Sequence, residues 1–230
     1  MQELPRITPH RFVYVRHGQT DWNHENRTQG SADITLNARG RKQAADSARA
    51  IQLSGRAVAR ICCSPLVRAQ ETAHIIASVL GLPMCITHEL REACFDEQEG
   101  QDKGAWLSAW RKGVDPVGAE PYSHFLQRVT VGLNKALKGP QEVQVVAHLA
   151  VYWAVEEALG HHPGPETGNC VPLLHTPHAT KAHVWTIARL SQLGRQRAVW
   201  FRQTDSDPRP HEAATRQLPA QDRAPRFSGK

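Results

Sequence analysis

The chain has 230 residues, of which 40% are hydrophobic and 22% are charged, which is enough for one globular domain with a sizeable core. Its net charge of +6 invites a nucleic-acid interpretation, but residues 191–230 hold eight Lys/Arg against four Asp/Glu and so carry +4 of it. The first 190 residues are nearly neutral and show no cluster of basic and aromatic side chains, which argues against nucleic-acid binding.

Residues 1–10 contain no apolar core of a signal peptide, and no window is long and apolar enough to predict a membrane span. The cysteines are odd in number and have no paired spacing, as is typical of reduced thiols in a cytosol. We therefore expect a cytoplasmic protein with no membrane partner, and the sequence leaves its oligomeric state open. The five cysteines are Cys62, Cys63, Cys85, Cys94 and Cys170.

Short apolar runs alternate along the chain with longer segments of helical periodicity. Strands are predicted at residues 11–15, 58–63, 84–87, 142–147, 182–188 and 196–201. Helices are predicted to begin near Asn37, at Ser64, at Pro121 and at about Ala150. Ser64 is interpreted as the N-cap of its helix, with a proline next and Gly81 as the end.

Strands that alternate with helices predict an α/β fold in which helices cover both faces of a largely parallel sheet. Residues 1–203 are predicted to form one catalytic domain, and residues 93–120 an irregular, lid-like excursion over it. Apolar residues are sparse from Thr204 on, so residues 204–230 are predicted to be a disordered tail.

Ligands of a parallel sheet bind beyond the carboxyl ends of its strands, so the residues that follow each strand are candidates for function. Two histidines, two or three arginines and a carboxylate take such places. The candidates are Arg16, His17, Arg68, Glu92 and His148, and Arg91 also follows a strand.

This set of side chains suits phosphoryl transfer. A neutral imidazole can accept a phosphoryl group covalently, and guanidinium groups with a second imidazole can stabilise the charge on its oxygens. A carboxylic acid of raised pKa can protonate the leaving alkoxide. Arg68 also lies near a helix N-terminus, where a cation opposes the helix dipole, and such conflicts are commoner at functional sites.

The motifs around these residues, in their order, resemble those of the histidine phosphatase superfamily, the phosphoglycerate-mutase-like proteins. The resemblance covers roughly residues 11–190. Its main blocks are VRHGQT at 15–20 with Trp22-Asn23, SPLVRAQETA at 64–73, Leu90-Arg91-Glu92 with Phe95 and Glu99-Gly100, and Val146-Ala147-His148.

The resemblance implies a three-layer α/β/α sandwich with a mostly parallel sheet of about six strands, one of them antiparallel. It implies a phosphatase that hydrolyses small phosphate monoesters through a phosphohistidine on His17, with Glu92 as the proton donor and no cofactor or metal. His148 completes the catalytic set. Arg16, Asn23 and Arg68 are implied to bind the phosphate of a small phosphorylated metabolite.

Four positions depart from the family pattern. Leu149-Ala150 follows the second histidine, where the family usually has a small pair such as Gly-Gly, and we expect the leucine to crowd the phosphate pocket or narrow its mouth. Asp96 replaces a usual glycine, and Gln98 replaces a common tryptophan. These changes spare the catalytic set and bear on substrate range and turnover.

Several alternatives stay open. A phosphoglycerate mutase shares all of this chemistry, but usually has a longer insertion than the 55 residues between Glu92 and His148. A catalytically weak regulatory member of the family is supported only by Leu149. Glu89, Glu97 and Glu99 compete with Glu92 for the role of proton donor.

Two side-chain clusters have both a structural and a functional interpretation. Trp106 and Trp110 lie four residues apart, as on one face of a short lid helix or in a wall for an apolar substrate. The late histidines match no closed zinc pattern, so surface positions are favoured over a metal site. The residues concerned are His161, His162, His175, His178 and His183, with Cys170.

Overall fold

A computed structural model describes residues 5–161, 167–181, 184–191 and 197–199. Residues 197–199 are described by their backbone alone. The tail predicted at 204–230 and parts of the strands predicted at 182–188 and 196–201 lie outside the described residues. In the described part, no helix combines the length and the apolar character that crossing a bilayer requires.

A seven-stranded mixed sheet in the order β3-β2-β4-β1-β5-β6-β7 forms the centre of the described structure. β1 pairs with β4 in parallel, as β2 does with β3 and β4, whereas β5, β6 and β7 join by antiparallel pairs. The strands are β1 (Phe12–Arg16), β2 (Arg60–Cys63), β3 (Met84–Ile86), β4 (Val143–Ala147), β5 (Leu173–Pro177), β6 (Trp185–Arg189) and β7 (Arg197–Val199).

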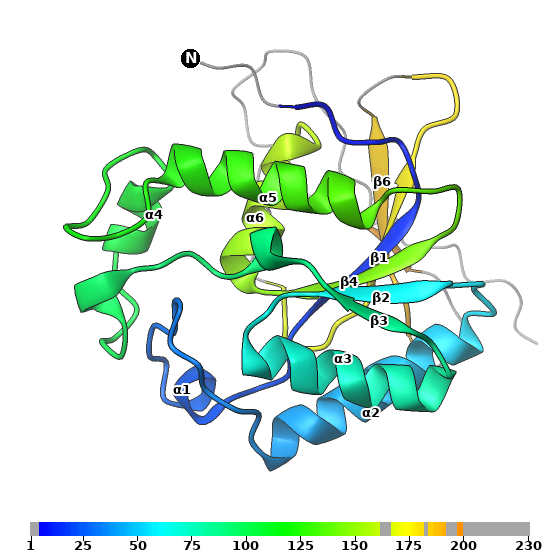
Figure 1. The fold of residues 1–230 in the computed structure, drawn as a ribbon, viewed down its shortest axis with the longest axis horizontal. Coiled ribbons are helices and arrows are strands. Elements are labelled where there is room, and N and C mark those ends of the chain that lie inside the picture. Colours follow the sequence, from blue (N-terminus) through cyan, green and yellow to red (C-terminus); the bar gives the residue numbers. More distant parts are fainter. Residues whose placement is uncertain (1–4, 162–166, 182–183, 192–196, 200–230) are drawn as a thin grey trace, which may run out of the picture.

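Helices cover both faces of this sheet. α2 and α3 lie on one face and α5 and α6 on the other, as Figure 1 shows. The short elements α1, α4, η1 and η2 lie in the connections. The helices are α1 (Asp21–His24), α2 (Ala38–Leu53), α3 (Val67–Leu80), η1 (His88–Leu90), η2 (Asp96–Gln98), α4 (Trp106–Trp110), α5 (Tyr122–Ala136) and α6 (Leu149–Ala158).

The apolar runs of the sequence place the core. In a strand, successive side chains point to opposite faces, so Cys62 packs in the cluster under α5 and α6 and Cys63 in the one under α2 and α3. β1 and β4 are buried throughout because both faces are covered. The predicted α/β fold with helices on both faces is confirmed.

The strand that the sequence did not predict is β5, so the sheet has seven strands where about six were expected. β5 ends in Pro177 and contains His175, so its sequence lacks the continuous apolar or alternating pattern that predicts a strand. β5 and β7 run against the other five, so two strands are antiparallel where one was expected.

Candidate active site

Three neighbouring parallel strands end side by side and bring the two histidines together. β1 and β4 pair up to Arg16 and Ala147, so the next residues, His17 and His148, leave the sheet at the same edge. The amide of His17 donates to the carbonyl of Ala147 at 2.9 Å. The two imidazole rings lie with their centroids 5.2 Å apart.

The imidazole of His17 is held in one tautomer. Its Nδ1 lies 2.8 Å from the carbonyl oxygen of Gly18, and because a carbonyl only accepts, Nδ1 carries the proton and Nε2 the lone pair. Burial, with the charges of Arg68 and Arg16, holds the pKa of His17 well below its ordinary value. The ring is therefore neutral at neutral pH, as a nitrogen nucleophile must be.

Two buried arginines are close enough for their charges to act on this ring. Arg68 is 0% exposed and donates to the carbonyls of Ala32 and Gly30 at 2.7 and 2.8 Å. Arg16 donates to the carbonyl of Thr167 at 3.0 Å. Burial lowers the pKa of Arg68 to about 10, so it stays charged at neutral pH. Carbonyl groups are neutral, so these hydrogen bonds orient the cations without neutralising them, and an anionic ligand can still pair with the charge.

Arg68 is the second residue of α3, and its Nε has no hydrogen-bond partner among the described residues. An unpaired buried donor is costly unless a ligand completes it. The positive charge of Arg68 lies near the positive end of the α3 dipole, as predicted, and a bound anion would offset that repulsion.

His148 is fully buried and bonds through Nε2 to the hydroxyl of Ser64 at 2.6 Å. Its Nδ1 has no partner among the described residues. The prediction that Ser64 is a helix N-cap was wrong: Leu66 takes that position without a side-chain cap, and α3 begins at Val67. Ser64 follows β2, beside the end of β4, so its hydroxyl orients the second histidine instead.

Glu92 lies on the segment after η1, and its side chain is buried. Its two carboxyl oxygens accept from the amides of Ala93 at 3.1 Å and Ala150, in the first turn of α6, at 3.2 Å. Burial raises its pKa, although Arg68 and the two amides oppose the shift. A carboxyl of raised pKa beside a phosphate pocket is suited to donate a proton.

The competing glutamates have other partners or positions. Glu89 pairs with Lys135. Glu99 accepts from the amide and hydroxyl of Ser31 at 2.7 and 2.9 Å, and Glu97 is exposed. Among the four, Glu92 is the one that lines the cavity described below.

Asn23 uses its carbonyl oxygen within the protein, where it accepts from the amide of Thr20 at 3.2 Å in the capping box of α1. The donors that it could offer a ligand are those of its amide nitrogen.

One cavity, open to solvent, collects the predicted site residues except His148, whose ring centroid lies 5.2 Å from that of His17 and which is not part of the lining. Its floor is polar and cationic, and one wall is apolar. The lining residues that carry the later argument are Arg16, His17, Asn23, Arg68 and Glu92 on the floor and Phe95, Leu107, Leu149 and Trp153 on the wall.

Several residues of the site were not predicted from the sequence, among them Asn169, Lys103 and Leu107. Asn169 donates from its amide nitrogen to the carbonyl of His17 at 2.8 Å. Lys103 and Leu107 line the cavity. They come from the irregular 93–120 segment and from the loop after α6, and neither segment has a periodicity that would have revealed them.

The two tryptophans of that segment mainly serve the core. Trp110 is fully buried, with its ring 4.8 Å from that of Phe95 and 4.9 Å from that of Tyr122. Trp106 packs against Phe95 at 5.1 Å. The tryptophans support a wall residue, Phe95, and do not themselves line the cavity.

Among the late histidines, His175 is a core residue that stacks on Phe12 with ring centroids 4.5 Å apart. His162 and His183 lie outside the described residues.

The chain is similar to several known proteins. It is 32% identical over 152 residues to an uncharacterized phosphatase of Bacillus subtilis, covering 65% of this chain and 77% of that one. It is 33% identical over 135 residues to a probable phosphoglycerate mutase of an Enterobacter species, covering 54% and 59%. A solved mycobacterial glucosyl-3-phosphoglycerate phosphatase superposes with a TM-score of 0.64 at 27% identity, over 77% of this chain and 97% of that one.

The family model of the histidine phosphatase superfamily, branch 1, matches residues 12–171, which is more than half of the chain and includes every residue of the site described above. With the geometry of the paired histidines, this match places the protein: it belongs to branch 1 of the histidine phosphatase superfamily.

Proposed function

We propose that the protein is a phosphatase that hydrolyses small phosphate monoesters through a phosphohistidine on His17. The observation that carries this proposal is the hydrogen bond from Nδ1 of His17 to Gly18, which leaves Nε2 unprotonated in a cavity that two buried arginines also line. A nucleophile and its charge stabilisers are thus in place before the substrate binds.

In the first step, Nε2 of His17 attacks the phosphorus and the bond to the alcohol oxygen breaks. Glu92 gives its proton to that oxygen, so the leaving group departs as a neutral alcohol. In the second step, water attacks the phosphohistidine and gives its proton to the Glu92 carboxylate. Phosphate leaves, and His17 and Glu92 return to their starting forms.

Arg16, Arg68 and His148 stabilise the negative charge on the transferred group, which is the role that a metal ion has in other phosphatases. Asn23 adds amide donors at the same floor. The protein's own cations thus supply the charge that the reaction needs, and the partner that the site fits is a small phosphorylated metabolite.

A phosphoglycerate mutase is the second candidate, favoured by the similarity to the probable mutase of Enterobacter. The chemistry of the two activities is shared, but a mutase must keep its phosphohistidine until the product rebinds. The 55 residues between Glu92 and His148 form a shorter connection than the mutase pattern usually has, which favours hydrolysis.

The test is an assay of the purified protein on an aryl phosphate after extensive treatment with EDTA, with samples quenched in alkaline detergent, digested at alkaline pH and analysed for phosphate on His17. We expect chelator-resistant turnover and a phosphorylated His17 peptide. A chelated enzyme that is inactive until Mg²⁺ or Zn²⁺ returns would contradict the mechanism. Transfer of the phosphoryl group between the 2- and 3-positions of phosphoglycerate, faster than its release to water, would favour the mutase.

A further inference from the structure

The cavity above His17 has two unlike sides. Arg27, Thr28, Gln29 and Lys103 contribute polar side chains to its lining, and four apolar side chains contribute the rest of the surface considered below. We define the apolar wall as Phe95, Leu107, Leu149 and Trp153.

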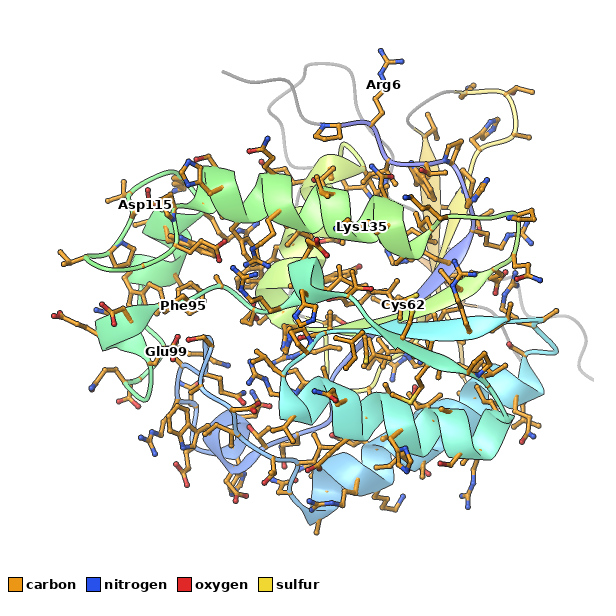
Figure 2. All side chains as sticks on the ribbon, viewed as in Figure 1. Arg6, Cys62, Phe95, Glu99, Asp115 and Lys135 are labelled. Carbon is orange, nitrogen blue, oxygen red and sulfur yellow. The ribbon has the colours of Figure 1, made fainter. Side chains whose placement is uncertain are left out.

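The wall is a rigid construction from three segments. Phe95, which is labelled in Figure 2, follows the Glu92 segment. Its ring makes edge-to-face contacts with Trp106 and Trp110. Leu107 belongs to α4, and Leu149 and Trp153 lie one turn apart on α6. The guanidinium of Arg111 covers one face of the Trp153 ring at 4.5 Å. Side chains packed in this way present a preformed apolar surface.

Glu92 links this wall to the reacting atoms. Its carboxyl is held by the amides of Ala93 and Ala150, so it is anchored on the two segments that carry Phe95 and Leu149. A proton donor must lie within hydrogen-bond reach of the leaving oxygen. The alcohol part of a substrate that Glu92 protonates therefore lies on the side of the apolar wall.

We infer that the apolar wall binds the alcohol part of the substrate, and that the preferred substrates are phosphate monoesters of alcohols carrying an apolar, preferably flat, group next to the ester carbon. This inference rests on the proposed phosphatase function. It extends the expectation for Leu149: the side chain narrows the pocket mouth and at the same time supplies part of its binding surface.

The test compares 2-phenylethyl phosphate with ethyl phosphate. Both leaving groups are primary alcohols of similar basicity, so a difference in kcat/KM reports binding of the phenyl group rather than leaving-group chemistry. We expect kcat/KM to be at least about tenfold higher for the phenylethyl ester, within the range that apolar pockets provide. The Leu107→Asn variant should lower that ratio by about fivefold or more.

Val117→Asn is the matched control, because Val117 is 81% exposed and is not part of the cavity lining. It should leave the ratio unchanged. Leu107→Ala serves as a milder second variant if the asparagine variant unfolds, which a thermal melt would reveal.

The outcomes separate the two proposals. If neither ester is hydrolysed, the proposed function fails. If both are hydrolysed with equal kcat/KM, the phosphatase stands and the inference about the apolar wall is overturned. It is also overturned if the preference survives in both Leu107 variants, because then the phenyl group binds elsewhere.

Discussion

At the scale of single residues, the carbonyl oxygen of Gly18 decides which nitrogen of His17 can react. It accepts the proton of Nδ1, and the lone pair of Nε2 remains for substrate. His17→Ala removes the nitrogen that would carry the phosphoryl group, so we expect turnover to be abolished while the fold is kept. Steady-state assays and a circular dichroism spectrum measure both. A variant that keeps more than about a tenth of the wild-type rate would contradict covalent catalysis by His17.

Glu92→Gln tests the proton donor. The amide keeps the shape of the carboxyl but is far too weak an acid to protonate the leaving oxygen, so hydrolysis of an alkyl phosphate should slow by about 10²–10⁴-fold. An aryl phosphate has a better leaving group that needs less protonation, so the same substitution should slow its hydrolysis by a smaller factor. Rates on ethyl phosphate and phenyl phosphate provide the comparison, and equal losses on both would move the donor role to another residue.

Ser64→Ala tests the positioning of His148. The variant removes the hydroxyl that Nε2 contacts at 2.6 Å and leaves His17 and both arginines untouched. We expect kcat to fall by about tenfold with little change in KM, since the misplaced imidazole no longer aligns with the transition state. Ser64→Thr keeps the hydroxyl and should restore most of kcat. If neither variant alters kcat, Ser64 does not orient His148.

At the scale of secondary-structure elements, two glycines allow α2 to pack on the loop that carries His17. A Cβ on Gly40, in the first turn of α2, would lie 2.1 Å from the carbonyl oxygen of Gln19. A Cβ on Gly18 would lie 2.5 Å from the carbonyl oxygen of Gly40. The loop and the helix approach each other backbone to backbone, so neither has a flexible side chain that could move aside.

Gly40→Ala sets two effects against each other. Alanine favours the helix by about 1 kcal/mol, whereas the clash with the backbone forces α2 away from the loop at a cost of about 1–3 kcal/mol or more. We expect the clash to win, so the free energy of unfolding should fall and activity with it. Urea denaturation checks this, with the exposed neighbour Arg39→Ala as control, expected within about 0.5 kcal/mol of wild type. An unchanged or raised stability would show that α2 moves freely.

Elements with strong periodicity or clear ends could be predicted from the sequence. β1, β2, β3 and β4 lie where apolar runs indicate strands, and α3 ends as predicted at Gly81, which adopts a left-handed conformation. β5 could not be predicted, because its residues carry little apolar signal and its partner β1 is remote in sequence. Pairing of that kind is a property of the tertiary structure.

The site residues likewise divide into those that a local pattern predicts and those that depend on tertiary structure. Residues directly after strands could be predicted, because topology brings the ends of parallel strands together. The roles of Ser64, Asn169 and Leu107 depend on hydrogen bonds and packing between distant segments, and no local pattern encodes them. Asn169, for example, contacts His17 across 152 residues of chain.

At the scale of the whole molecule, buried histidines make stability depend on pH. The pKa values of His17 and His148 are held well below the ordinary value, chiefly by burial, and burial lowers that of His175 to about 3. Below about pH 6.5 these histidines therefore bind protons in the unfolded chain but stay neutral in the folded chain. The stabilisation is complete above that pH and is lost as the pH falls. The raised pKa of Glu92 acts in the opposite direction.

We expect the free energy of unfolding to decrease from about pH 7 to about pH 5.5, each such histidine costing up to about 1.4 kcal/mol per pH unit below its unfolded pKa. Urea titrations at both pH values measure the slope. His175→Phe keeps an aromatic ring against Phe12 and removes one titrating group. The free energy of unfolding of this variant should therefore depend less steeply on pH, by the contribution of about one proton. A slope equal to that of wild type would mean that His175 does not contribute.

The central position of β1 has a consequence for how the chain is made. β1 lies between β4 and β5, and its parallel partner is about 130 residues further along the chain. During translation the first strand therefore waits, apolar and unpaired, until β4 leaves the ribosome. The candidate site therefore forms late in synthesis, and a nascent chain that stops before Val143 carries His17 after a strand that has neither of its partners.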